Sequence, residues 1–299
     1  MSIRTERPVF RMANRHATTR RRMSPARILP YLLLVPSLLL LFALLVLPLG
    51  IILLSSLQPN VLLTFEGPGL DNYAYLLSKG YYIDVIVRTV RLSLVTTLIA
   101  IPLGFVAALL IARLGDGIRN IALMGLTFPI LTGPLAIVLG WMALLTDGGP
   151  LFGPLIALGI IGPQRLLGTE TAVVISLVQF VLPFAVLTLF TAVSRIPGHL
   201  YEAVTSLGGG FWSRLRHISI PLSLPGILSA SIICFSLSAS SYISPYYLGG
   251  AAQQTLTTLV AQFILATYNS QLAAAAILLL LVMLAAIVGF TMLLGRWIR

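Results

Sequence analysis

Charged residues and cysteine are both scarce in this sequence. Only 9% of its 299 residues are charged and 58% are hydrophobic, whereas soluble domains carry about 25% charged residues. This deficit excludes an ordinary soluble globular enzyme. The single cysteine, Cys234, lies inside an apolar run, so an internal disulfide and a cysteine cluster for metal are both excluded. We interpret Cys234 as a small buried apolar side chain.

Acidic residues are fewer than basic residues. The sequence has 8 Asp and Glu against 19 Lys and Arg, which gives a formal net charge of +11. On a soluble surface such an excess would favour nucleic-acid binding. Eight of the basic residues lie within positions 1–27, ahead of long apolar runs, so no nucleic-acid partner is predicted. No Asp or Glu lies in the middle of those runs, which argues against an ion-coupled pathway.

Two kinds of catalytic machinery are also missing from the sequence. The nucleotide-binding pattern G-x-x-x-x-G-K-[ST] requires a lysine before Ser or Thr, but the only lysine, Lys79, is followed by Gly80. The three histidines, His16, His199 and His217, are not accompanied by a carboxylate pair. We therefore predict that the chain is not an enzyme, and that any ATP-derived energy comes from a partner.

Long apolar runs dominate what is present. A helix needs about 20 apolar residues to cross a hydrocarbon core of about 30 Å. The first run is too long for the apolar part of a signal peptide and is predicted to be a retained span. The sequence therefore predicts an all-α polytopic membrane protein in a lipid bilayer, with six transmembrane helices at 31–56, 84–112, 120–145, 171–193, 223–245 and 272–295.

The basic residues predict the orientation of these spans, because Lys and Arg concentrate on the cytoplasmic side. With the N-terminal tail inside, 15 of the 19 fall on cytoplasmic segments. We therefore expect both termini in the cytoplasm. The tail, 1–27, has no hydrophobic period and is predicted to be disordered, ahead of a transmembrane domain at 28–299. The tail either fixes topology or binds anionic lipid.

The segment between the fourth and fifth predicted spans, 194–226, has helix signals of its own. Pro197 suits a first helical position, and Glu202 follows where the helix dipole favours a negative charge. Three glycines at 208–210 are expected to end that helix. A second short amphipathic helix is predicted over 211–217, so the segment is expected to form a cytoplasmic helix–turn–helix.

This segment resembles the cytoplasmic loop of the inner-membrane permease subunits of binding-protein-dependent ABC importers. The family pattern is Glu-Ala-Ala, three residues, Gly, nine residues, Ile-x-Leu-Pro. The chain has Glu202 and Ala203, then Gly208, then Ile218 and Pro221 at matching spacing. It departs from the pattern by a valine at 204 and an isoleucine at 220, both apolar replacements. Pro221, with a second proline at 225, is also predicted to start the fifth span.

The resemblance implies that the loop, 194–221, is a coupling helix that docks on a separate ATP-hydrolysing subunit. It implies a dimer of such ATPase subunits, which bind ATP and Mg, and no cofactor in this chain. It also implies a second homologous permease or a second copy, an external periplasmic or extracellular solute-binding protein, and a bacterial inner membrane. The residues assigned to coupling are Glu202, Ala203, Leu207, Gly208, Ile218 and Pro221.

The resemblance extends to the spermidine/putrescine type of permease, through 88–97 and 244–250, although iron-, thiamine- and opine-type relatives share these patterns. It implies half of a pathway for a polyamine-like cation or another small organic solute. An aromatic and hydroxyl cluster is a candidate pathway or outer gate, but an interfacial aromatic belt would look the same. The cluster comprises Ser238, Ser241, Tyr242, Tyr246 and Tyr247.

Three other readings of the sequence stay open. Arg88 and Arg91 share a helical face and either snorkel to headgroups or face the pathway. The segment 251–271 predicts a short outer helix that packs on the bundle or meets a binding protein. A self-sufficient secondary transporter or channel is the alternative function; it predicts internal repeats and mid-membrane charges, and neither is found in the sequence.

Overall fold

The computed structural model describes residues 25–59, 69–146 and 166–297, and between the last two ranges residues 149–150, 153–154 and 158. Every regular element in these residues is helical and none is a strand, which confirms the all-α prediction. Of the tail predicted over 1–27, residues 1–24 lie outside the described residues, whereas 25–27 are helical and belong to the first helix. The chain divides into two units, residues 1–50 and 51–299.

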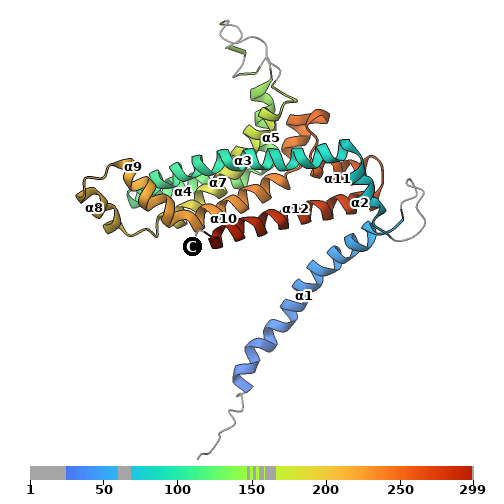
Figure 1. Cartoon of the computed structure of the whole chain (residues 1–299), viewed down its shortest axis with the longest axis horizontal. Coiled ribbons are helices and arrows are strands. Elements are labelled where there is room, and N and C mark those ends of the chain that lie inside the picture. The colour runs from blue at the N-terminus through green and yellow to red at the C-terminus, as the bar shows by residue number, and fades with distance from the viewer. Residues whose placement is uncertain are drawn as a thin grey trace, which may run out of the picture. The chain divides into compact units, whose positions relative to one another are not determined.

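Helix α1 runs from Pro25 to Ser56. Its leucines from Leu34 to Leu47 are exposed, as expected of a helix whose surroundings are lipid. The remaining long helices are α3 Gly80–Ala112, α4 Asp116–Thr132, α5 Pro134–Leu145, α7 Glu170–Val193, α10 Ile220–Ala239 and α12 Ser270–Trp297 (Figure 1).

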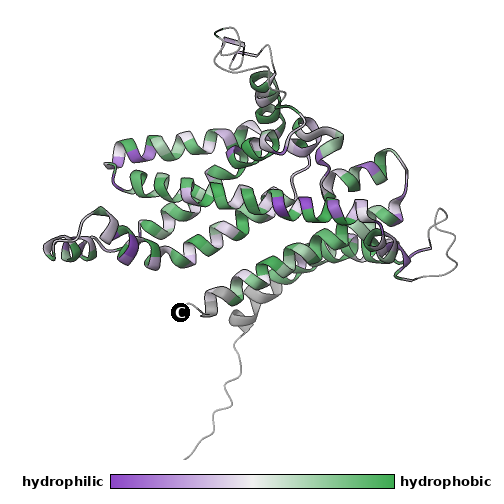
Figure 2. Cartoon of the chain, turned by 45° about the horizontal axis from the view of Figure 1, so that its top comes forward, coloured by the Kyte–Doolittle hydropathy of each residue, from purple (hydrophilic) through white to green (hydrophobic). Residues whose placement is uncertain are grey.

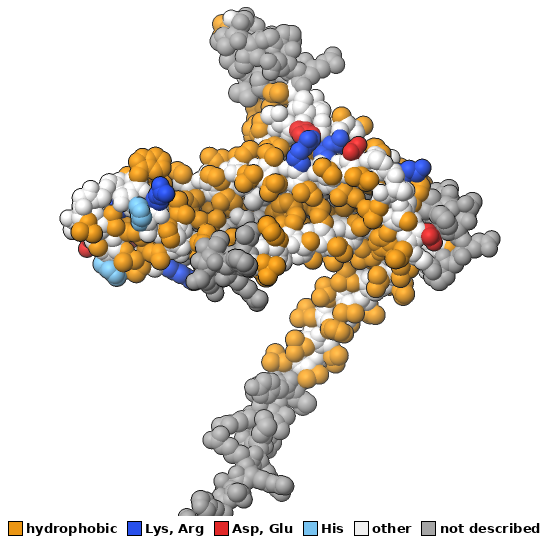
Figure 3. All heavy atoms as spheres, in the orientation of Figure 1, with side chains coloured by type: hydrophobic (Ala, Val, Ile, Leu, Met, Phe, Trp, Pro, Cys, Tyr) orange, Lys and Arg blue, Asp and Glu red, His pale blue; other side chains and the backbone are white. Residues whose placement is uncertain are grey.

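Five stretches are long and apolar enough to cross a membrane: Leu34–Ser56, Gly80–Ala112, Glu170–Val193, Phe211–Ala239 and Ser270–Leu293. A sixth is obtained if α4 and α5 are counted as one span. The described helices are hydrophobic along most of their length (Figure 2), and hydrophobic side chains cover most of the described surface in the face seen in Figure 3, with few charged side chains among them. This distribution suits helices that cross a bilayer.

The third predicted span, 120–145, is not one continuous helix. The axes of α4 and α5 differ by 91° across Gly133, whose φ is +80°. A positive φ is accessible to glycine at little cost, and Pro134 has no N–H to continue the helical hydrogen bonds. The two residues together end α4 and redirect the chain.

The fifth predicted span, 223–245, also differs from the structure at both ends. The short helix α9, Phe211–Arg214, runs without a break through a π-helical turn, Leu215–Ser219, into α10. The expectation of a separate helix at 211–217 was therefore wrong. Pro221 lacks an N–H and its ring would clash with the carbonyl four residues earlier, and a wider π turn relieves that conflict. At the other end α10 stops at Ala239.

Small residues bring α3, α7 and α10 close together. Ala100, Gly104 and Ala108 recur every fourth residue along one buried face of α3. A Cβ atom built on Gly104 would lie 3.0 Å from the Cβ of Ala185 on α7. Two turns further along α7, a Cβ built on Gly226 of α10 would lie 2.3 Å from the Cβ of Ala192. Close backbone approach of this kind is the usual way helices associate in membranes.

A second apolar cluster forms where α2 (Asp71–Ser78) and α11 (Leu256–Leu265) pack on α12 and the start of α3. Leu256, Leu259 and Phe263 of α11 are buried there, which confirms the short helix expected within 251–271. The four alanines at 273–276 of α12 are also buried. Thr255 caps α11 through reciprocal hydrogen bonds with the third residue of the helix, so its start is fixed.

The close approach of α7 and α10 predicts different outcomes for two glycine substitutions. Gly226→Ala should lower stability by about 1–3 kcal/mol, the usual cost of overpacking, because its new methyl would overlap Ala192. Gly289→Ala on α12 is the matched control, because a Cβ there meets nothing within 4 Å. The measurement is the thermal unfolding midpoint of each purified variant in detergent. Equal midpoints for the two variants would contradict the packing described here.

Candidate functional site

The short helix α8, Gly198–Ser206, forms the first half of the loop between α7 and α10. Pro197 is its N-cap, one residue outside the first helical position that the sequence suggested. At its other end the N–H of Gly209 donates to the carbonyl of Val204 at 2.8 Å, and the N–H of Gly208 donates to Thr205 at 2.9 Å. These two bonds form a Schellman motif.

Two glycines of the triplet are required by this turn, for different reasons. Gly208 has φ +77°, a conformation that costs other residues about 1–2 kcal/mol. Gly209 has an ordinary backbone, but a Cβ there would lie 2.4 Å from Cγ1 of Val204. The sequence predicted that the glycine triplet ends the helix, but the specific need for glycine at 209 could not be predicted, since only the folded turn shows how closely Val204 approaches it.

The tip of the loop exposes large apolar side chains. Leu207 is 88% exposed and Trp212 is 76% exposed. Phe211 is also exposed and meets the Trp212 ring edge-on at 5.7 Å between centroids. Glu202 and Ala203 lie on the exposed surface of the adjacent helix. Exposed apolar side chains clustered on a loop of fixed shape are typical of an interaction surface.

Contacts to the ends of the long helices hold the loop in place. The hydroxyls of Tyr201 on α8 and Ser219 lie 3.2 Å apart and are hydrogen-bonded. The guanidinium of Arg113, at the end of α3, lies 5.7 Å from the centre of the Phe211 ring, within cation–π range. Ile218 is buried, whereas Pro221 is exposed. Of the six residues assigned to coupling, five are therefore exposed, and the buried Ile218 helps to anchor the loop.

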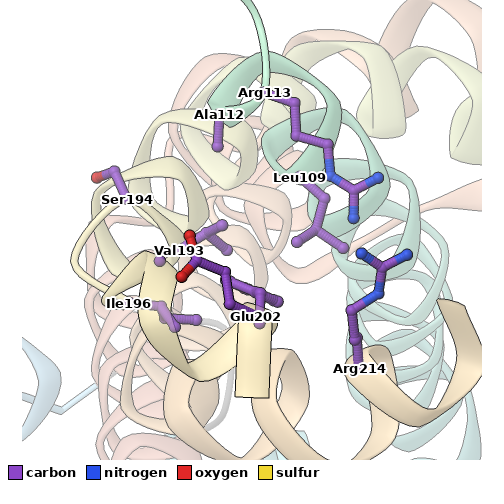
Figure 4. Close-up of a pocket in the computed structure, with 10 residues that line it drawn as sticks. Leu109, Ala112, Arg113, Val193, Ser194, Ile196, Glu202 and Arg214 are labelled. Atoms are coloured by element: carbon purple, nitrogen blue, oxygen red, sulfur yellow. The ribbon is translucent and has the colours of Figure 1, made fainter. Parts of the chain in front are cut away.

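A cleft of about 410 Å³ lies between α8 and the C-terminal ends of α3 and α7 (Figure 4). Glu202 reaches into it from α8, while the guanidinium groups of Arg113 and Arg214 point toward one another on its other side. Nε of Arg214 is buried without a hydrogen-bond partner. No ion pair joins Glu202 to either arginine within the described part of the chain. Sequence analysis did not anticipate this arginine pair.

A second cavity, of about 510 Å³, lies between α11 and the segment that follows α10. Tyr242, Tyr246 and Tyr247 line it together with the carboxamides of Gln254 and Gln262. Tyr242 and Tyr246 are stacked with centroids 5.1 Å apart, and Tyr247 meets Tyr246 edge-on. The structure therefore brings the three predicted tyrosines together.

Burial, and then the neighbouring phenols Tyr246 and Tyr247, raises the pKa of Tyr242 above its ordinary value. Its phenol is therefore neutral at physiological pH.

The two serines predicted with these tyrosines do not line that cavity. The Ser238 hydroxyl is buried and donates to the carbonyl of Cys234 at 2.6 Å, within its own helix. The Ser241 carbonyl accepts a hydrogen bond of 2.8 Å from the Thr257 hydroxyl. Both serines therefore take part in hydrogen bonds that hold the helices and the following segment, and neither lines the cavity.

Two arginines in the N-terminal half of α3 join helices together. Arg91 forms an ion pair with Glu170 at the start of α7. Arg88 Nη1 donates to the backbone carbonyl of Gln254 at 3.4 Å. The Gln254 carboxamide in turn accepts from the hydroxyl of Tyr81 and donates to Gln262 at 3.0 Å. These bonds fix the wall of the tyrosine cavity relative to α3.

Within the described residues, no group of three or more His, Cys, Asp or Glu side chains is placed to hold a metal ion. Cys234 is fully buried, as the sequence suggested.

Comparisons with known proteins cover most of the chain. Residues 100–299 match the family described as the binding-protein-dependent transport system inner membrane component. The spermidine/putrescine transport system permease protein PotB of Salmonella typhimurium is 32% identical over 197 residues, which are 65% of this chain and 68% of that protein. The diacetylchitobiose uptake system permease protein DasB of Streptomyces coelicolor is 26% identical, over 87% and 86% of the two chains.

Solved structures share the fold. A chain of a bacterial alginate ABC transporter, in complex with an alginate-bound periplasmic protein, superposes with a TM-score of 0.76 at 19% identity, over 91% of this chain and 96% of that chain. The MetNI methionine ABC transporter, in an inward-facing conformation, superposes with a TM-score of 0.57 at 18% identity, over 75% and 97%. The chain therefore belongs to the family of inner-membrane components of binding-protein-dependent transport systems.

Proposed function

We propose that this chain is the transmembrane subunit of an ATP-driven importer and that its loop at 194–221 transmits the motion of an ATPase. The observation that carries the proposal is the shape of the loop. A helix fixed by a Schellman turn presents Leu207 and Trp212 to solvent while Tyr201 ties it to the end of α10. A rigid, anchored, apolar protrusion can transmit a rigid-body displacement to the helices behind it.

The proposed partners follow from this role. Two ATPase subunits bind ATP and Mg and receive one loop each, one from this chain and one from a homologous permease or a second copy. An external solute-binding protein delivers cargo to the opposite side. Loop 194–226 then lies in the cytoplasm with both chain termini, in accord with the concentration of basic residues on those segments.

The proposed cargo is a small polyamine-like cation. The spermidine/putrescine permease relatives support this assignment, and so does the tyrosine cavity, because aromatic faces attract ammonium groups. The residues that line the cavity include no charged side chain. Neutral aromatic and amide groups bind a cation weakly enough to release it, as transport requires.

Leu207→Asp should abolish docking of the ATPase without unfolding the chain. Leu207 is 88% exposed, so a polar replacement costs little in the free chain, but it removes an apolar anchor from the interface. Loss of such an anchor costs about 2 kcal/mol or more, or about thirtyfold in affinity. The measurement is co-purification of the ATPase with tagged chain from the native membrane, combined with cargo uptake.

Leu70→Asp is the matched control, because Leu70 is 68% exposed and precedes α2, far along the chain from the loop. It should retain both the ATPase and uptake. If Leu207→Asp also retains the ATPase at wild-type stoichiometry, the loop is not the docking element.

Tyr246→Leu should raise the KM for spermidine uptake, by about 2–30-fold if it removes a cation–π contact worth about 0.5–2 kcal/mol. Tyr246→Phe keeps the ring and should restore most of the affinity. Recovery of the ATPase should be unchanged in both variants. The control is Phe290→Leu, which removes an exposed ring on α12 away from the cavity. A wild-type KM for Tyr246→Leu would exclude the ring from the pathway.

A further inference from the structure

The bend between α4 and α5 forms a groove of its own. About 390 Å³ of space lies inside the bend and against α7, lined by Phe128 and Thr132 of α4, Gly140 and Trp141 of α5, and Gln179 of α7. The residues with small or no side chains on this face of α5 leave room beside the Trp141 indole. None of the cavities already described shares these residues.

Gln179 is an unusual residue for a lipid-facing surface. It is the tenth residue of the 24-residue α7, so it lies about 14 Å along the helix at 1.5 Å per residue. Its side chain is exposed in the isolated chain. A polar side chain at this depth is costly in lipid, and such residues usually face a pathway or a water-filled cavity. The groove is therefore a candidate part of the aqueous route.

The polar groups of the groove are oriented. Trp141 Nε1 donates a hydrogen bond to Oε1 of Gln179. Because an indole N–H can only donate, the carboxamide of Gln179 must turn its oxygen toward the Trp141 indole. The Thr132 hydroxyl donates to the carbonyl of Phe128 at 2.9 Å, so the hydroxyl oxygen is left as an acceptor. The Thr132 oxygen and the second lone pair of Gln179 Oε1 thus remain as acceptors at fixed positions, while the NH2 group of Gln179 remains a donor.

The end of α4 adds further acceptors. The last four carbonyls of an α-helix have no partner within it, and Pro134 has no N–H to offer them. The C-terminal end of a helix carries partial negative charge. The N-terminus of α5 lies at the same bend and carries partial positive charge. Pro134 is the first residue of α5 and has no N–H, so this end has one donor fewer. Interrupted helices of this kind mark binding sites in transporters, where the C-terminal ends favour cations.

We propose that the groove at the α4–α5 bend is a second cargo station, which binds an alkylammonium group between the Trp141 ring and the acceptors of Gln179, Thr132 and the end of α4. This proposal rests on the proposed import function and names the substrate class at a site distinct from the tyrosine cavity. The lining residues, all in the described part of the chain, include no charged side chain. The methylene chain of such a cargo fits the apolar wall formed by α5.

A charge-sign test separates this role from a structural one. Gln179→Lys places a like charge against an ammonium group and should raise the KM for labelled spermidine by about tenfold or more. Gln179→Glu has similar size and the opposite charge, so the KM should not rise. Both variants should still co-purify with the ATPase. Equal effects of the two variants, or the reverse order, would overturn the assignment of an alkylammonium ligand.

The control for the groove surface is Thr127→Val, since Thr127 is exposed on α4 but does not line the groove. It should leave the KM unchanged, whereas Thr132→Val should raise it. If the wild-type transporter retains its ATPase but takes up no spermidine, the assignment of a polyamine-like cargo is wrong for both the tyrosine cavity and the groove. If the ATPase is not recovered with wild-type chain, the import function itself fails.

A second experiment does not depend on the identity of the cargo. Because Cys234 is the only cysteine, Cys234→Ala gives a background in which Gln179→Cys is the single thiol. In the assembled transporter, the thiol of Gln179→Cys should react with the water-soluble reagent trimethylammonium-ethyl methanethiosulfonate at least about tenfold faster than the thiol of Val282→Cys. The reason is that the reactive thiolate forms only where water reaches the thiol. Val282 is the matched control, 62% exposed on α12. Equal, slow labelling would place the groove outside the aqueous route and overturn the proposal.

Discussion

The close contact among α3, α7 and α10 is the constraint on which the remaining structure depends. In a bilayer the hydrophobic effect does not hold helices together, so association relies on packing and interhelical hydrogen bonds. Gly104 lets α3 approach α7 at Ala185, and Gly226 lets α10 approach α7 at Ala192, so closely that an added methyl would crowd the alanine. The three helices therefore pack as one bundle, with the exposed loop at one end and the tyrosine cavity toward the other.

This arrangement explains why the loop contains so many conformational restraints. In the proposed importer, a displacement applied at Leu207 would reach the bundle only if α8 cannot rotate on its own. The Schellman turn at Gly208, the Tyr201–Ser219 hydrogen bond and the continuous helix from Phe211 into α10 remove that freedom. The π turn before Pro221 keeps the helix continuous where a proline would otherwise break it.

Sequence patterns predicted the features that depend on composition or on local chemistry. Apolar run length indicated the long helices, Gly208 indicated the end of α8, and the spacing of Leu256, Leu259 and Phe263 indicated α11. Features that depend on distant neighbours could not be predicted. The need for glycine at 226 follows from Ala192, which lies on another helix. The bend at Gly133 was missed because the apolar run continues through it, and run length carries no information about helix direction.

The distribution of charge bears on how a cation could cross this chain. Arg91 is neutralised by Glu170 and Arg88 is held by a backbone carbonyl, both at the outer turns of α3. The two cavities on the proposed route instead combine aromatic rings with carboxamides: tyrosines with Gln254 and Gln262, and Trp141 with Gln179. A fixed carboxylate at either place would bind a polycation tightly and slow its release, whereas several weak sites permit it to move between them.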